Sequence, residues 1–299
     1  MMRLLSAVSF AALLVLAVAC APQETKPTDA VAIPYGANKD VGATFVHDGV
    51  TLYYETYGQG EPLLLVHGNG ASIGTLAAQI DHFKAKYRVV AMDSRDHGRS
   101  ADSEEPITYE KMTDDLAALI DHLKLGPVDV VGWSDGGVEA LLLGVRHPGK
   151  VKKIVAMSAN LTPGPEAFGP EVAALLKSLT ELPDKAKNTP EGRRQLKVAG
   201  MVLKEPNIPP AMLAKVAAPT LVLASDHDLV RLEHVVTIYR SLPNAQLAIF
   251  PNATHMIPYD DPGQFNGAVD HFLATPFKKI DLIPQTMGSL EMIVAGLAH

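Results

Sequence analysis

The sequence predicts an α/β fold in which a mostly parallel, twisted β-sheet is flanked by helices. Continuous apolar runs of strand length recur along the chain, and most are followed by a stretch with helical periodicity. Such runs are typical of parallel strands, because helices cover both faces of the sheet. With 299 residues, 47% hydrophobic and 20% charged, the chain has the size and composition of one large globular domain with an insertion.

The N-terminus has the composition of an export signal. Met1 to Arg3 is followed by an apolar run from Leu4 to Ala19, which is short against the roughly 20 residues of a spanning helix. The run ends at Cys20, the single cysteine of the chain. This end resembles a bacterial lipoprotein signal, in which the cysteine is lipidated and becomes the mature N-terminus; that signal usually has Leu where this chain has Ala17. The alternative is that Cys20 is a small residue in a signal cleaved nearby.

We therefore expect residues 1–20 to be a signal peptide and the protein to be exported. It would be anchored to a membrane through lipid on Cys20, in the periplasm or at the cell surface, or otherwise be secreted. No cysteine follows Cys20, so the mature chain has no disulfide. Residues 21–40 lack apolar periodicity and are expected to form a linker. The net charge of -7, with scattered Lys and Arg, gives no reason to expect nucleic-acid binding.

The folded domain is expected over residues 41–275 and begins with a hairpin. Residues 44–57 alternate apolar and polar side chains around Asp48-Gly49, which predicts an antiparallel edge pair. Six apolar runs then predict buried strands: Leu63 to Val66, Tyr87 to Met92, Val128 to Val131, Val151 to Met157, Thr220 to Ala224 and Ala245 to Phe250. Thr108 is expected to cap a helix that Gly126-Pro127 ends, and another helical pattern starts at Val138. Ligands bind such sheets at the carboxyl ends of the strands, so motifs that directly follow strands matter most.

The alternation is interrupted from about residue 161 to residue 215. No strand is predicted there, but several helical stretches begin at proline. The stretch from Pro170 places Val172, Leu175, Leu176 and Leu179 on one face. We expect this insertion to be a helical lid, with an extra packing layer as the alternative. Residues 276–299 exceed what the sheet requires and are expected to form a C-terminal extension.

Three motifs directly follow predicted strands. Gly132-Trp133-Ser134-Asp135-Gly136 also opens a predicted helix, which is the context of a nucleophile elbow. The others are His67-Gly68-Asn69-Gly70 and Asp93-Ser94-Arg95-Asp96-His97-Gly98-Arg99-Ser100. In this order, the three motifs resemble the α/β-hydrolase superfamily, and within it the small esterases related to valacyclovir hydrolase and biphenyl-hydrolase-like proteins. The resemblance covers residues 44–275 and departs at Asp96, where the family usually has glycine, which leaves the shape of this turn open.

The resemblance implies an α/β-hydrolase fold and a serine hydrolase with Ser134 as the nucleophile. In the superfamily the acid and then the histidine follow the serine. His255, a short loop after the last predicted strand, matches the base. Both Asp226 and Asp228 follow an earlier strand; the resemblance favours Asp228 as the orienting acid and leaves Asp226 to shape the turn. The Asp-His-Asp run has no further ligands at suitable spacing, so we expect no metal and no cofactor.

The same resemblance implies an oxyanion hole formed by the backbone N–H groups of Asn69 and Asp135, with His67 bracing the loop. The Asp135 carboxylate either favours a cationic group on the substrate or faces solvent or a neighbouring helix. The expected reaction is hydrolysis of carboxylic esters of small molecules through an acyl-enzyme on Ser134. Alternatives are amide, lactone, thioester or carbon-carbon hydrolysis, acyl transfer to another alcohol, and a catalytically silent binding lipoprotein. The oligomeric state is not given by the sequence.

Overall fold

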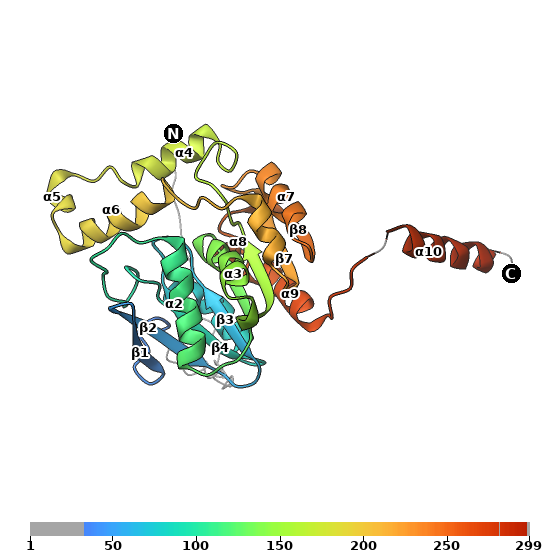
Figure 1. The fold of residues 1–299 in the computed structure, drawn as a ribbon, viewed down its shortest axis with the longest axis horizontal. Helices are drawn as coiled ribbons and strands as arrows, with labels where there is room; N and C mark the ends of the chain where they lie inside the picture. Colours follow the sequence, from blue (N-terminus) through green and yellow to red (C-terminus); the bar gives the residue numbers. More distant parts are fainter. Residues whose placement is uncertain (1–32, 281, 298–299) are drawn as a thin grey trace, which may run out of the picture. The chain divides into compact units, whose positions relative to one another are not determined.

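The computed structural model describes residues 33–280 and 282–297 (Figure 1). The predicted signal peptide, Cys20 and most of the predicted linker lie outside these described residues. The helices and strands of the described residues all belong to the unit Pro34–His299. Within the described part of the chain, no helix combines the length and apolar character needed to cross a membrane.

Eight strands form one sheet in the order β1-β2-β4-β3-β5-β6-β7-β8. The hairpin of β1 (Gly42–His47) and β2 (Val50–Tyr57) turns at Asp48 and Gly49, whose φ angles of 48° and 72° suit a type I′ turn. β2 pairs with β4 in antiparallel fashion, and the remaining strand pairs are parallel. These strands are β3 (Pro62–Val66), β4 (Arg88–Met92), β5 (Val128–Trp133), β6 (Val151–Met157), β7 (Thr220–His227) and β8 (Ala245–Thr254). The predicted mostly parallel sheet is confirmed.

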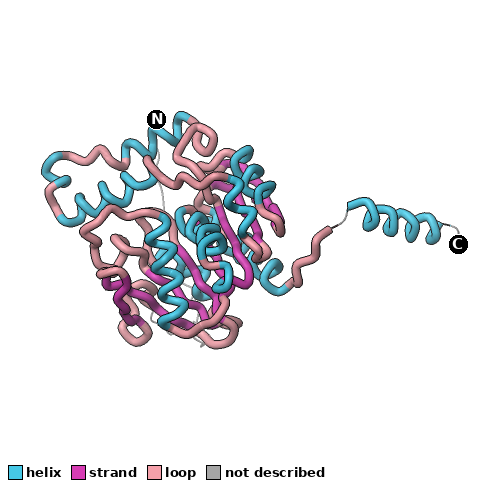
Figure 2. The backbone as a smooth tube through the Cα atoms, in the orientation of Figure 1, coloured by secondary structure: helices cyan, strands magenta, loops and turns pink. Residues whose placement is uncertain are grey.

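Helices cover both faces of the sheet (Figure 2). One apolar core forms beneath α2 (Tyr109–His122), α3 (Asp135–Arg146) and α7 (Leu232–Ser241). The other forms beneath α1 (Ala77–Phe83), α8 (Ile257–Asp260) and α9 (Pro262–Ala274), with the 3-10 turn η1 (Ile73–Leu76). Along β3, Leu64 and Val66 belong to the first core, whereas Leu63 and Leu65 belong to the second. Because both faces are buried, the strand reads as a continuous apolar run.

The insertion between β6 and β7 is helical. It contains α4 (Pro170–Ser178), α5 (Asp184–Lys187), α6 (Pro190–Val202) and the 3-10 helix η3 (Pro210–Lys215), and η2 (Pro148–Lys150) precedes β6. α6 buries Val198 and its neighbours, whereas α4 buries no residue and leaves Leu175 49% and Leu179 41% exposed. The apolar face predicted for α4 is therefore only partly covered. After α9, the extension forms α10 (Leu282–Leu297).

Candidate active site

Ser134 lies at a strained turn between β5 and α3. It immediately follows β5, caps the N-terminus of α3, and has φ 58° and ψ -119°. A Cβ on Gly132 would lie 1.9 Å from the carbonyl oxygen of Gly136, and one on Gly136 would lie 2.2 Å from that of Val66. Only glycine fits at both positions, so the motif brings strand and helix together and projects the serine at the end of the sheet.

The structure brings Ser134, His255 and Asp228 together. The Ser134 Oγ lies 3.0 Å from Nε2 of His255, and the Nδ1 of His255 lies 2.7 Å from Oδ1 of Asp228. The sequence prediction of a loop before His255 is wrong, because β8 continues to Thr254, which still pairs with His227 of β7. His255 therefore follows the strand directly, and strand pairing sets its distance from Asp228.

The Asp228 carboxylate is fully buried and held on both oxygens. Oδ2 accepts hydrogen bonds from the hydroxyl of Ser158 and the backbone N–H of Ser225, while Oδ1 accepts from the backbone N–H of Val230 and from His255. Burial alone would raise the pKa of this carboxyl, but the hydrogen bond and charge of His255, helped by Ser158, hold it below the ordinary value. The acid is therefore ionised and fixed toward the imidazole.

Asp226 makes different contacts. Its two oxygens accept the backbone N–H groups of Asn252 and Ala253, at 2.7 and 3.0 Å, and the residue is exposed. It shapes the end of β8, and the distances assign the imidazole contact to Asp228 instead.

Sequence reasoning missed two side chains that hold the triad. Ser158 directly follows β6, has a φ of 53° and reaches Asp228. The Trp133 indole N–H donates to the backbone carbonyl of His255 at 2.9 Å, and the two rings lie 5.7 Å apart. The position of Ser158 after a strand was the available signal, whereas nothing in the sequence relates Trp133 to His255.

The His67-Gly68-Asn69-Gly70 loop lies against Ser134. A Cβ on Gly68 would be only 3.0 Å from the Cβ of Ser134. His67 is buried; its Nδ1 lies 2.8 Å from the carbonyl oxygen of Gly68, and its Nε2 accepts the backbone N–H of Ser94. Burial lowers its pKa to about 4, so the ring is neutral and braces the loop. Among the described residues, the backbone N–H groups of Asn69 and Asp135 have no hydrogen-bond acceptor.

The Asp135 side chain faces a neighbouring helix. It is buried, and its Oδ1 accepts the hydroxyl of Tyr109 on α2 at 2.7 Å. Its Oδ2 accepts the side-chain amide of Asn69 at 2.9 Å. Burial raises the pKa of Asp135, although these two donors counteract it. The two residues predicted to line the oxyanion hole are thus joined by their side chains, a link that sequence reasoning did not foresee.

Asp96 occupies a turn that favours glycine. Its φ is 61°, in the left-handed region, which explains why a glycine would suit this position. The carboxylate compensates locally by accepting the backbone N–H and the hydroxyl of Ser103. The departure from the family pattern therefore leaves the turn in a glycine-like shape.

A cavity of about 470 Å³ lies between the His67–Gly70 loop, the turn of Asp96 and the insertion. Its lining includes Asn69, His97 and Gly98 on one side and Leu179, Val198 and Ala199 on the other. This volume is within the roughly 300–1,000 Å³ of small-molecule sites. A pocket beside Asn69 is therefore available to a small ligand.

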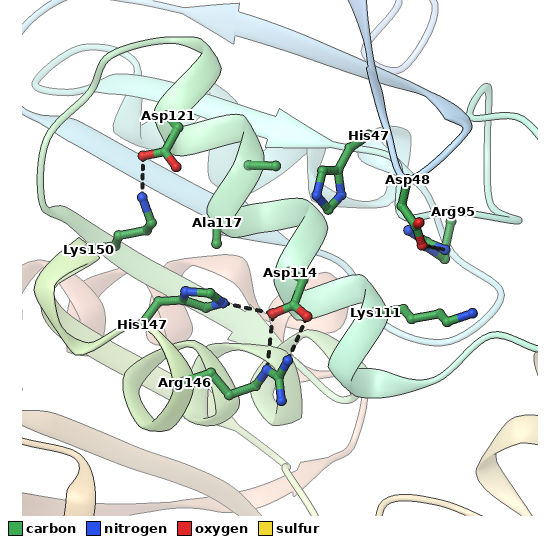
Figure 3. Close-up of a pocket in the computed structure, with 11 residues that line it drawn as sticks. His47, Asp48, Arg95, Lys111, Asp114, Ala117, Asp121, Arg146, His147 and Lys150 are labelled. Atoms are coloured by element: carbon green, nitrogen blue, oxygen red, sulfur yellow. Dashed lines mark hydrogen bonds and ion pairs between the residues drawn. The ribbon is translucent and has the colours of Figure 1, made fainter.

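Another cavity, of about 540 Å³, lies among the β1–β2 hairpin, α2 and the end of α3 (Figure 3). Figure 3 shows Asp114 facing Arg146 and His147, and Lys150 facing Asp121. Asp114 binds both Arg146 and His147, and Lys150 pairs with Asp121. The lining contains no residue of the triad, and these ion pairs brace α2 against α3.

The family described as alpha/beta hydrolase fold matches residues 61–195. The chain is 30% identical to the non-heme chloroperoxidase CPO-A1 of Kitasatospora aureofaciens, over 76% of this chain and 97% of that protein. It is 27% identical to the serine hydrolase BPHL of Homo sapiens, over 76% and 84%. A solved structure, the serine hydrolase CarC of carbazole degradation, superimposes with a TM-score of 0.66 at 26% identity, covering 78% and 98%. With this topology, site geometry and similarity, the chain belongs to the α/β hydrolase fold family.

Proposed function

We propose that the protein is a serine hydrolase that cleaves carboxylic esters of small molecules through an acyl-enzyme on Ser134. The observation that carries this proposal is the continuous hydrogen-bonded line from the Ser134 hydroxyl through both nitrogens of His255 to Asp228. A serine hydroxyl becomes an effective nucleophile when an adjacent base removes its proton. The similarity to proteins named serine hydrolases supports the same chemistry.

The geometry gives each group one task. The Ser134 oxygen attacks the ester carbonyl carbon while Nε2 of His255 takes the hydroxyl proton, and the Asp228 carboxylate stabilises the imidazolium. The backbone N–H groups of Asn69 and Asp135 receive the oxyanion, reinforced by the positive end of α3. His255 then returns the proton to the leaving alcohol oxygen. A water molecule, deprotonated by the same histidine, then attacks the acyl carbon. The ester bond to Ser134 breaks, the carboxylic acid leaves, and His255 returns the proton to the Ser134 oxygen.

The substrate side of the proposal rests on the cavity beside Asn69. Leu179, Val198 and Ala199 give it an apolar wall, while charged residues of the insertion form part of the rest. We propose that α4, α5 and α6 act as a lid over a small acyl or alcohol group. The partly uncovered Leu175 and Leu179 on α4 support a helix that changes its packing when substrate enters.

The decisive experiment compares wild type with Ser134→Ala on short-chain p-nitrophenyl esters and with a fluorophosphonate probe. We expect the wild type to turn over and become labelled, and the variant to lose nearly all turnover and all labelling at an unchanged melting temperature. Ser289→Ala is a matched control, since Ser289 is an exposed serine of α10 whose hydroxyl donates to the backbone carbonyl oxygen of Gln285. Wild type that neither hydrolyses esters nor takes the probe would favour a silent binding protein instead.

Lactones, amides and added alcohols in the same assay distinguish the remaining reactions. Faster cleavage of a lactone or amide than of any ester would replace the ester proposal, because all these bonds can use one triad. Alcohol that accelerates acyl release and forms a new ester would indicate acyl transfer.

We also propose that the protein is exported and anchored by lipid on Cys20. The support is the apolar run that ends at this cysteine and the polar segment that follows it. Cells producing the full chain should incorporate labelled palmitate and retain the protein in the membrane fraction. Cys20→Ser should abolish both, whereas unlabelled wild type would leave an ordinary cleaved signal as the explanation.

A further inference from the structure

Helix α6 of the insertion contacts two loops of the hydrolase core through consecutive residues. Lys197 reaches the turn that contains Asp96, and Val198 reaches the oxyanion loop at Asn69. One turn earlier, Arg194 binds Asp102 and the carbonyl oxygen of Gly98. A single helical segment therefore contacts both loops on either side of the cavity.

The contact with Asp96 is largely withdrawn from water. Asp96 is 1% exposed, and its Oδ1 lies 2.8 Å from Nζ of Lys197, whose side chain is 22% exposed. The same ammonium also donates to the carbonyl and hydroxyl oxygens of Ser103. The Lys197 ammonium thus has three acceptors, all on Asp96 and Ser103 of the same core loop. A partly buried ion pair with this many hydrogen bonds fixes geometry better than an exposed pair does.

The contact with Asn69 links the helix to the oxyanion loop. The side-chain amide of Asn69 donates to the carbonyl oxygen of Val198 at 3.1 Å and to Oδ2 of Asp135 at 2.9 Å. The Asn69 side chain therefore ties α6 to the residue that follows Ser134. Because Lys197 and Val198 are adjacent on one helix, a displacement of α6 at Lys197 also moves the Val198 carbonyl oxygen and the Asn69 side chain bonded to it.

We propose that Asp96 and Lys197 are positioning residues for the oxyanion hole, and that they act through the hydrogen bond between Val198 and Asn69. This inference rests on the proposed serine hydrolase function. The ion pair fixes the position of α6 relative to the hydrolase core. α6 then fixes the Asn69 side chain through the carbonyl oxygen of Val198, and this side chain sets the direction of the Asn69 backbone N–H. Misplacement of a reacting group by about 1 Å can cost on the order of 100-fold in rate, so such a tie matters to catalysis.

Two substitutions break the ion pair, one from each side. Lys197→Met keeps the apolar stem and removes the ammonium. Asp96→Gly removes the carboxylate, and glycine suits the φ of 61° without strain. Lys204→Met is the matched control, because Lys204 is an exposed lysine just beyond α6.

We expect both variants to lower kcat about 10-fold with KM little changed, less than the roughly 100-fold or more of losing an oxyanion donor outright. Inhibition by a trifluoromethyl ketone, whose adduct carries an oxyanion, should weaken in parallel. Hydrogen exchange in the peptide of residues 67–72 should quicken. Asn69→Ala should reproduce the loss, and adding Lys197→Met to it should cost nothing more, because both act through one bond.

Unchanged kcat, a change confined to KM, or additive losses in the double variant would overturn the inference. The control should match wild type in every readout, and melting curves identify any variant that is merely unfolded. Wild type without any hydrolase activity would defeat the proposed function. In that case, unchanged exchange at residues 67–72 in Lys197→Met would independently defeat the tie between α6 and the oxyanion loop.

Discussion

Asp228→Asn should nearly abolish turnover through the tautomer of His255, although it changes one atom. The Ser158 hydroxyl and the Ser225 backbone N–H both donate to Oδ2. Two donors meet Oδ2, whereas only the longer 3.3 Å contact from the Val230 backbone N–H competes at Oδ1, so we expect an asparagine at 228 to place its carbonyl oxygen at the Oδ2 position. Its amide NH₂ then replaces Oδ1, 2.7 Å from Nδ1 of His255. Nδ1 becomes an acceptor, so the ring proton moves to Nε2 and faces Ser134, whose proton it can no longer take.

The expected loss in kcat is roughly 10⁴-fold, the effect of the same change in the serine protease triad. This corresponds to about 5 kcal/mol of transition-state stabilisation. Because Nδ1 faces Asp228 and Nε2 faces Ser134, a change at Asp228 also disables the base at Ser134. The loss is therefore far larger than that of one ordinary hydrogen bond. Hydrolysis of p-nitrophenyl acetate and the rate of fluorophosphonate labelling both measure it.

Asp226→Asn is the matched comparison, two residues away in the same run. Its carboxylate accepts the backbone N–H groups of Asn252 and Ala253 and lies 4.0 Å from Nε2 of the exposed His227. We expect a lower melting temperature and kcat within about twofold of wild type, because no atom of the triad contacts it. The reasoning fails if Asp228→Asn retains a tenth of wild-type activity, or if Asp226→Asn proves the more damaging change.

Three further substitutions test other parts of the structure. Burial holds the pKa of Glu139 well above its ordinary value, so the folded chain keeps a proton that the unfolded chain releases above about pH 4.5, and stability falls as pH rises. Glu139→Gln should therefore leave the calorimetric melting temperature nearly unchanged at pH 4 and raise it at pH 8; equal shifts at both would contradict this. Gly136→Ala places a Cβ 2.2 Å from the Val66 carbonyl oxygen and should yield little soluble protein, whereas Gly200→Ala, with open space, should behave as wild type. Trp133→Phe removes the indole donor to the His255 carbonyl and should lower kcat about 3- to 10-fold by loosening the imidazole, with stopped-flow acylation as the readout and normal acylation as the refuting result.

The sequence predicted the strand starts better than the strand ends. The predicted starts of the six buried strands lie within one residue of the observed ones, because the buried part of each strand is mostly apolar and both faces lie under helices. β7 and β8, however, continue through polar residues to His227 and Thr254, with an irregularity after Ser225. Backbone pairing needs no apolar side chain there, since this end of the sheet reaches solvent. Apolar periodicity therefore could not locate His255 directly after a strand.

The triad could be predicted because its members follow strands that share one edge of the sheet. The side chains that support the triad and its neighbour Asp135 could not be predicted in this way. Tyr109 and Trp133 reach Asp135 and His255 across long sequence separations. Tyr109 lies in no recognisable motif, and the Gly132–Gly136 motif that contains Trp133 does not relate its indole to His255. Their roles follow from how α2 and β5 pack, which depends on the whole core.

Backbone strain gathers at the same edge of the sheet. The non-glycine residues with positive φ include Asp96, Ser134, Ser158 and Asn252, all on or just after strands β4, β5, β6 and β8. Glycine would fit each of these conformations at lower cost. At three of these positions, however, glycine would remove a side chain that the site uses. These are the Asp96 carboxylate that binds Lys197, the Ser134 hydroxyl, and the Ser158 hydroxyl that binds Asp228. The chain therefore accepts unfavourable turns where a side chain must project from the strand ends, whereas the other two described residues of this kind, Asp48 and Lys124, lie in the β1–β2 hairpin and after α2.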